Sequence, residues 1–256
     1  MNILCIFLAG GLGLIIGSAT NAAIYRLHTK KPGFWTGRSA CPQCDHELSA
    51  LDLVPVLSWV LLGGECRYCH TAISKQYPIV ELVMAATFAV LTWHVGIGNF
   101  FALGWYLLAA AVLIFIAAYD WVYGDIPDEV SLPAIPIAVL ASYFSFTPSW
   151  SNSLIGLAVG GGLFLGIVLI SNGRWMGGGD IRLGALLGAL LGWQDVLLTI
   201  FLASLGGSII GGALMYLKKA TGKTALPFGP ALVAAAVMSW IWGDQIISWY
   251  LMTVVF

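Results

Sequence analysis

The feature that most constrains this chain is a series of long apolar stretches separated by short polar segments. Eight of them approach the roughly twenty residues that a helix needs to cross a bilayer, at residues 3–24, 79–95, 100–119, 132–147, 153–171, 180–194, 196–217 and 228–245. Only 9% of the 256 residues are charged, against about 25% in soluble domains. The sequence therefore predicts an all-α polytopic membrane protein of about eight transmembrane helices. Because Pro133 and Pro136 interrupt one stretch, seven crossings are the alternative.

Basic residues indicate how the chain is oriented, because lysine and arginine favour cytoplasmic loops. With the amino terminus outside, all 11 fall on the cytoplasmic side: Arg26, Lys30, Lys31, Arg38, Arg67, Lys75, Arg174, Arg182, Lys218, Lys219 and Lys223. No charge precedes the first apolar stretch, so it is expected to be an anchor and not a cleaved signal peptide. The net charge of -1 offers no basic surface for nucleic acid. We expect a multi-pass membrane protein with its amino terminus outside.

The polar loop at residues 26–78 is long enough to form a small domain and holds four of the five cysteines. Cys41 and Cys44 form one C-x-x-C pair, and Cys66 and Cys69 form a second, with 21 residues between the pairs. This spacing is typical of a structural Zn²⁺ site, in which four thiolates leave no open position for water. Two disulfides or a thioredoxin-like redox couple are the alternatives, which a reducing compartment and the absence of a βαβ pattern disfavour. Cys5 lies within the first apolar stretch and is expected to be a small packing residue.

Two acidic residues at the predicted cytoplasmic edge of the membrane are the candidates for catalysis. Asp120 ends an apolar stretch, and Asp180 follows three glycines just before another. Ionisable groups in such places are by default functional candidates. Two neighbouring carboxylates that share a proton supply the general base and general acid that peptide hydrolysis needs. The alternative for each residue is a solvated helix cap.

Other residues are given lesser roles. Asp125, Asp128 and Glu129 are interpreted as structural or substrate-contacting, with Asp128 as a helix cap, whereas Glu81 lies inside the second stretch and should need a polar partner. Asp195 and Asp244 fall on the predicted outer side. Gly13 and Gly17 predict close helix packing and not a nucleotide fingerprint, because no strand precedes them. The sequence has no H-E-x-x-H motif and no histidine after His94, which disfavours metalloprotease and serine mechanisms.

Ordered motifs along most of the chain resemble those of the bacterial type IV prepilin leader peptidases, which are intramembrane aspartyl proteases with a G-x-G-D signature. The motifs are Gly17-Ser18, Asn21, Ile24-Tyr25-Arg26, Arg38-Ser39, the two cysteine pairs, residues 52–59 (DLVPVLSW), Ile73-Ser74, Gln76-Tyr77-Pro78, Glu81-Leu82, Asp120 with Ile126-Pro127-Asp128, and residues 177–183 (GGGDIRL). Arg182 stands where lysine is common, and Gly178 fills a variable position. In that family the aspartates that match Asp120 and Asp180 are the catalytic pair.

The resemblance implies cleavage of a short basic leader from prepilin or pseudopilin substrates at the cytoplasmic face of the bacterial inner membrane. It also implies, because the cysteine quartet is complete, methylation of the new amino terminus with S-adenosylmethionine. Glu81 and Lys75 are the candidates for binding this methyl donor. The acidic residues 125, 128 and 129 are hypothesised to attract the basic leader. A peptidase without methyltransferase activity and a membrane transporter or ion relay are the alternatives.

The expected organisation has three parts. Residues 1–25 form the first transmembrane helix, residues 26–78 a cytoplasmic zinc-knuckle domain associated with methyl transfer, and residues 79–256 the transmembrane peptidase core embedded in the lipid bilayer.

Overall fold

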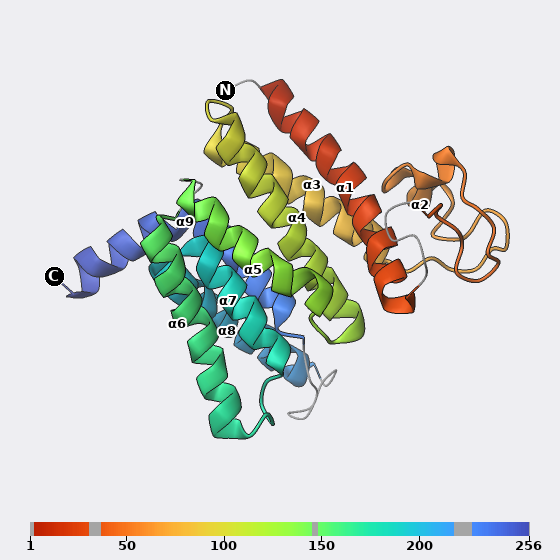
Figure 1. Ribbon diagram of the computed structural model, residues 1–256. Coiled ribbons are helices and arrows are strands. Elements are labelled where there is room, and N and C mark those ends of the chain that lie inside the picture. Colours follow the sequence, from red (N-terminus) through yellow and green to blue (C-terminus); the bar gives the residue numbers. More distant parts are fainter. Residues whose placement is uncertain (1–2, 31–36, 145–147, 218–226, 256) are drawn as a thin grey trace. The chain divides into compact units, whose positions relative to one another are not determined.

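The computed structural model describes residues 3–30, 37–144, 148–217 and 227–255, which are mostly helical (Figure 1). Lys31, Lys218, Lys219 and Lys223 of the predicted basic set lie outside the described residues. The α-helices are α1 (Ile3–Thr29), α2 (Leu57–Leu61), α3 (Gln76–Val95), α4 (Phe100–Tyr123), α5 (Asp128–Tyr143), α6 (Trp150–Ser171), α7 (Gly178–Leu191), α8 (Trp193–Tyr216) and α9 (Gly229–Tyr250). A 3₁₀ turn, η1 (Ala50–Leu53), precedes α2, and a π turn, η2 (Leu251–Val255), follows α9.

A helix occupies each of the eight apolar stretches, so the all-α prediction is confirmed. Within the described residues, six helices are long and apolar enough to cross a membrane, namely α1, α3, α4, α6, α8 and α9 with η2. The helices α5 and α7 have 16 and 14 residues, about 21–24 Å at 1.5 Å per residue, against a hydrocarbon core of about 30 Å. The structure thus supports a multi-pass helical membrane protein with six spans of full length.

The chain divides into two compact units, and the first comprises residues 1–118. In this unit α1 packs against α3 through two glycines. A Cβ atom at Gly13 would lie 2.7 Å from the Ala85 Cα, and one at Gly17 would lie 2.7 Å from the Glu81 Cα. The two backbones approach so closely that only glycine fits. The prediction that Gly13 and Gly17 serve helix packing is confirmed.

The second unit comprises residues 119–256 and is held together by a second glycine contact, between α6 and α7. A Cβ atom at Gly188 would overlap the Gly156 carbonyl, and one at Gly160 would overlap the Gly184 carbonyl. Each helix therefore presents two glycines four residues apart to the other, which is the small-residue packing common in membranes. This contact fixes α7, the helix that begins at the Gly-Gly-Gly-Asp segment.

Candidate active site and metal centre

Asp120 lies in the last turn of α4, and the amino terminus of α9 holds its carboxylate. The residue is only 7% exposed. The backbone N–H of Gly229, the first residue of α9, donates a hydrogen bond of 2.9 Å to Asp120 Oδ2. A Cβ atom at position 229 would lie 2.5 Å from the same oxygen. Glycine is therefore required here, because any side chain would displace the carboxylate.

Asp180 lies in the first turn of α7, three residues after the N-cap Gly177. Its half-buried carboxylate interacts with the Gly177 backbone, as an acidic N3 residue does at the start of a helix. Of the preceding glycines, only Gly179 makes a close approach, since a Cβ atom there would lie 3.0 Å from the Ile126 Cβ. Nothing lies within 4 Å of a Cβ atom at Gly178. The segment after α4 thus packs directly onto the start of α7.

This packing brings the two candidate aspartates into one electrostatic environment, in which the charge of Asp180 acts on Asp120. Each carboxylate also interacts with a backbone group at a helix start, Gly229 for Asp120 and Gly177 for Asp180. Where two carboxylates lie close enough to share a proton, one can act as a base and the other as an acid.

The other acidic residues near Asp120 are more constrained than the sequence indicated. The N-cap of α5 is Pro127, so the prediction that Asp128 is the cap is wrong. Asp128 lies instead in the first turn of α5 and forms an ion pair with Arg182 of α7. Asp125 Oδ1 accepts a hydrogen bond of 2.8 Å from the Ile126 backbone N–H. Asp128 is therefore a tether between α5 and α7, and its charge is already balanced.

The four loop cysteines converge on one point, as their spacing predicted. Their four Sγ atoms all lie within 4.8 Å of one another, and they belong to Cys41, Cys44, Cys66 and Cys69. The Cys41 and Cys69 Sγ atoms are 3.8 Å apart, which matches the edge of about 3.8 Å in a tetrahedron with Zn–S bonds of about 2.3 Å. A disulfide requires about 2.05 Å, and all four thiols are free. The donor set fits a structural zinc ion and leaves no ligand position for water.

The two cysteine pairs adopt the same backbone conformation 25 residues apart in the chain. In the first knuckle the Cys41 N–H donates to the His46 carbonyl, and in the second the Cys66 N–H donates to the Thr71 carbonyl. The residue after each pair, Asp45 or His70, has a positive φ of 52° or 55°. The two knuckles thus turn their sulfur atoms inward in the same way. Alignment of the two C-x-x-C motifs with each other could have indicated this repeat.

The surroundings of the thiols also shift their acidity in opposite directions. Hydrogen bonds with the Thr71 side chain and backbone lower the pKa of Cys69 to about 6. At Cys44 a hydrogen bond from the His46 backbone lowers the pKa, but burial and the neighbouring thiols Cys41 and Cys69 outweigh it and raise the pKa to about 11. Thiols crowded in this way favour a cation among them, because metal binding relieves the repulsion between thiolates.

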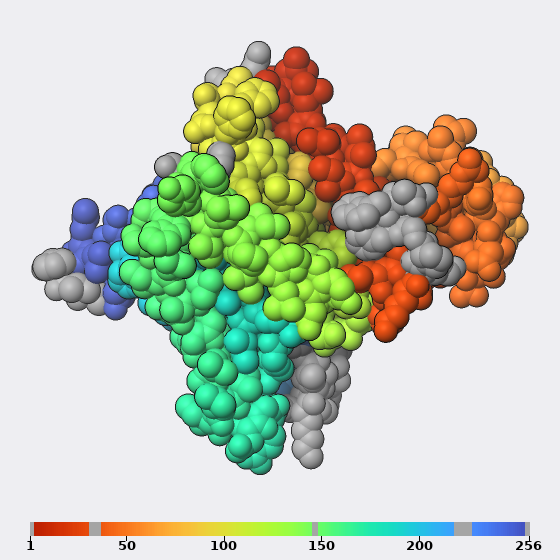
Figure 2. All heavy atoms as spheres, in the orientation of Figure 1, coloured from red at the N-terminus to blue at the C-terminus, as the bar shows by residue number. Residues whose placement is uncertain are grey.

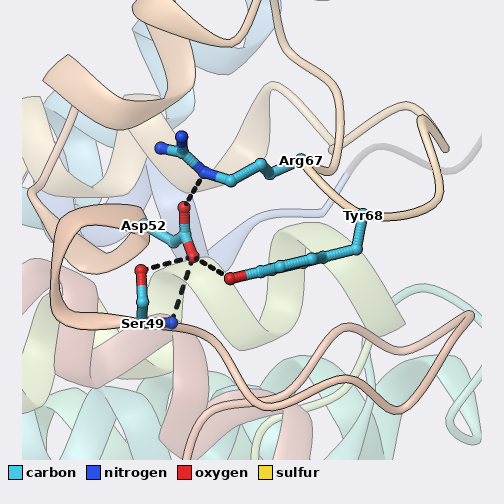
Figure 3. A network of polar contacts seen from close by, with 4 residues as sticks. All are labelled: Ser49, Asp52, Arg67 and Tyr68. Carbon is cyan, nitrogen blue, oxygen red and sulfur yellow. Dashed lines mark hydrogen bonds and ion pairs between the residues drawn. The ribbon is translucent and has the colours of Figure 1, made fainter.

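Asp52 connects the segment before α2 to the second knuckle (Figure 3). Its Oδ1 accepts a hydrogen bond of 2.7 Å from Arg67 Nε, and its Oδ2 accepts bonds from the Ser49 hydroxyl at 2.7 Å and the Tyr68 hydroxyl at 3.1 Å. Burial raises the pKa of Asp52, but the bonds from Ser49, Arg67 and Tyr68 outweigh it and lower the pKa to about 2. Arg67 and Tyr68 stand between the two cysteines of their knuckle, so Asp52 fixes its position.

Glu81 is buried in α3, 6% exposed, and has the polar partners that its sequence position required. Its Oε2 accepts a hydrogen bond of 2.7 Å from the Val56 N–H, and the Ser18 side chain of α1 also bonds to the carboxylate. Lys75, at the N-cap of α3, is exposed. No hydrogen bond or ion pair between Lys75 and Glu81 is found in the described parts of the chain, so the structure does not bring these two candidates together.

From the sequence, no role was assigned to three further residues of these sites. Gly229 acts through its backbone, Ile126 through packing on Gly179, and Val56 through its N–H. A partial signal was present for Gly229, since the Pro-Phe-Gly-Pro segment at 227–230 is typical of a helix start. Ile126 and Val56 stand within the family motifs, but a packing contact and a backbone N–H leave no residue-type signature from which their roles could be predicted.

Together the helices and the four-cysteine loop define a multi-pass helical membrane protein with a candidate metal centre. Two family descriptions match the chain, the bacterial peptidase A24 N-terminal domain over residues 12–95 and the type IV leader peptidase family over residues 107–212. The chain belongs to the type IV leader peptidase family.

Curated relatives agree with this assignment along most of their length. A prepilin leader peptidase/N-methyltransferase of Pseudomonas aeruginosa is 35% identical to this chain, and the alignment covers 97% of this chain and 93% of the relative. The protein of the same description from Bacillus subtilis is 33% identical and covers 98% of both chains. A third relative of that description, from Aeromonas salmonicida, is 36% identical over 85% of this chain and 75% of its own length. No solved structure matches.

Proposed function

We propose that this protein is a membrane aspartyl endopeptidase that removes the basic leader from prepilin or pseudopilin substrates and then methylates the new amino terminus. The observation that carries the proposal is the placement of Asp120 and Asp180 at two helix ends joined by the contact of Ile126 with Gly179. Membership of the type IV leader peptidase family and the names of the curated relatives support the substrate class and the second activity.

In the proposed reaction one aspartate is ionised and the other is protonated. The ionised carboxylate removes a proton from water, whose oxygen attacks the scissile carbonyl, while the protonated partner donates a hydrogen bond to the carbonyl oxygen. The tetrahedral intermediate then collapses, the C–N bond breaks, and a carboxyl group of the pair delivers a proton to the leaving nitrogen. The Gly229 N–H maintains the orientation of Asp120 throughout.

The proposed topology has eight crossings, with α5 and α7 as short crossings beside the six of full length. The amino terminus lies outside, and the aspartates and the cysteine loop lie on the cytoplasmic side of the inner membrane, as the basic residues indicate. The three-part organisation, with a first helix, a loop domain at 26–78 and a peptidase core at 79–256, belongs to the same proposal.

The cysteine loop is proposed to hold one structural Zn²⁺ through Cys41, Cys44, Cys66 and Cys69. The methyl group for the second activity would come from S-adenosylmethionine, with Glu81 and Lys75 retained as candidates for binding it. The Val56 N–H occupies Glu81 Oε2, so a role of Glu81 toward the methyl donor would use its remaining acceptor capacity or require this bond to open.

The deciding experiment incubates the purified protein with a prepilin and an isotope-labelled methyl donor and determines the product masses. We expect cleavage followed by addition of one methyl group. The Asp120→Asn and Asp180→Asn variants should lose cleavage but still methylate a precleaved substrate, whereas Asp244→Asn, at an exposed position of α9, should resemble the unmodified protein. Cleavage without methylation would identify a peptidase-only enzyme. Absence of both would favour a transporter or ion relay.

A further inference from the structure

The segment between the two knuckles has an unusually apolar outer surface for a polar loop. Residues 50–62 contain one charged side chain, Asp52, and it turns inward, 4% exposed, to bind Arg67. Six aliphatic side chains of this segment are exposed: Leu51 (71%), Leu53 (40%), Val54 (37%), Leu57 (55%), Val60 (59%) and Leu61 (75%). We call these six residues the aliphatic face. Exposed apolar side chains gathered in one short segment in this way indicate an interaction surface.

A hydrogen bond to Glu81 sets the depth of this segment relative to α1 and α3. The Val56 N–H donates to Glu81 Oε2, and the same carboxylate interacts with Ser18 of α1. Ser18 lies eight residues before Arg26, the first cation of α1, which is about 12 Å along the helix axis. Val56 is therefore held at the level of an uncharged part of α1. Figure 1 agrees, since α2 stands alongside α1 and not beyond its carboxyl end.

The backbone around Val56 also has the internal hydrogen bonding that a membrane environment requires. Val56 has φ 60° and ψ −48°, and the Leu57 N–H donates to the Pro55 carbonyl, which together form a γ-turn that is strained for a β-branched residue. The Val54 carbonyl accepts from the Ser58 N–H, the Val56 carbonyl accepts from the Val60 N–H, and proline has no N–H. Every backbone polar group from the Val54 carbonyl to the Leu57 N–H is thus bonded within the protein, as lipid requires.

We propose that the aliphatic face inserts into the cytoplasmic leaflet of the bilayer and anchors the cysteine loop to the membrane surface. The loop forms a lobe beside α1 in the space-filling view (Figure 2), and its leucines and valines lie at the boundary between headgroups and acyl chains. Elements of this kind bury their apolar face about 5–10 Å into that boundary. The anchor holds the metal centre against the membrane, and it does not depend on the proposed peptidase or methyltransferase activity.

The test uses the full-length protein in vesicles of phosphatidylethanolamine and phosphatidylglycerol, with an environment-sensitive fluorescent amino acid at one position. The probe is placed at Leu61 or Leu51 of the aliphatic face. Ile15, a 63% exposed residue of α1, is the lipid control, and Glu47, whose side chain is 61% exposed in the same loop, is the water control. Zinc content is measured in each variant, so that only folded loops are compared.

We expect probes at positions 61 and 51 to show blue-shifted emission and to be quenched more by a lipid nitroxide near the headgroup than by one deep in the acyl chains. Iodide should quench the Glu47 position far more strongly than either. Quenching of the 61 and 51 probes by iodide to the same extent as at Glu47 would overturn the proposal. So would protection from both iodide and lipid nitroxides, because it would mean that protein covers the aliphatic face.

A second variant tests the depth anchor itself. Glu81→Leu removes the acceptor of the Val56 N–H, whereas Glu81→Gln retains an oxygen acceptor at nearly the same place. With zinc still bound, nitroxide quenching at Leu61 should fall in Glu81→Leu and persist in Glu81→Gln. Equal quenching in the two variants would contradict the role of this bond in holding the segment in the membrane.

Discussion

The backbone N–H of Gly229 holds the carboxylate of Asp120, with the nitrogen 2.9 Å from Oδ2. The two residues are separated by 109 positions in the chain, so the end of α4 and the start of α9 define the position of this carboxylate together. Because the donor is a main-chain group, a substitution at position 229 leaves the N–H in place. Its effect comes from the side chain that it introduces.

Replacement of Gly229 by alanine should therefore damage catalysis selectively. The new Cβ atom would lie 2.5 Å from Asp120 Oδ2, and a misplacement of about 1 Å at a reacting group can reduce the rate about a hundred-fold. We expect kcat for prepilin cleavage to fall by this order with little change in KM. Gly206→Ala is the control, because nothing lies within 4 Å of a Cβ atom there. An equal loss in both variants, or normal kcat in Gly229→Ala, would refute the positioning role.

The glycines before Asp180 offer a second matched pair. A Cβ atom at Gly179 would lie 3.0 Å from the Ile126 Cβ, whereas one at Gly178 meets nothing within 4 Å. Overpacking of this kind costs about 1–3 kcal/mol, and here it would push the start of α7 away from the segment after Asp120. We expect Gly179→Ala to lower both the thermal midpoint and the cleavage rate, and Gly178→Ala to change neither. Identical behaviour of the two variants would show that this contact is unimportant.

Metal binding can be tested with two cysteines of different surroundings. Cys44→Ser removes one of four converging sulfur atoms, whereas Cys5→Ser alters a cysteine of α1 outside the cluster. Elemental analysis should find about one zinc ion per chain in the unmodified protein and in Cys5→Ser, and much less in Cys44→Ser. Full zinc retention by Cys44→Ser would exclude a four-thiolate site.

The sequence predictions agree with the structure where the residue type alone determines the local structure. The apolar stretches predicted the helices, and the paired C-x-x-C motifs predicted the convergence of four sulfur atoms. Gly13 and Gly17 predicted the close helix packing that is found between α1 and α3. The disagreements arise where a backbone group or a distant partner decides the outcome. Asp128 has the residue type of a cap, yet Arg182 of α7 binds it and Pro127 is the N-cap. Local preference was outweighed there by a tertiary ion pair.

The pH dependence of loop stability provides a test of the Asp52 network. The pKa of this carboxyl, about 2, lies below its ordinary value of about 3.9. The stabilisation by its ionised form is therefore complete above about pH 4 and is lost as the pH falls toward 2. Asp52→Asn should lower the thermal midpoint of zinc release by the same amount at every pH from 8 to 5.

Arg67→Met should reproduce much of this effect, because it removes the cation that contacts Asp52 Oδ1, and the double variant should be less affected than the sum of the two. Glu47→Gln is the control, since its pair with Arg38 is exposed at both ends, 61% and 81%, and exposed pairs contribute little. A deficit in Asp52→Asn that disappears between pH 8 and 5 would show that this carboxylate titrates in that range and that Arg67, Tyr68 and Ser49 do not hold it ionised.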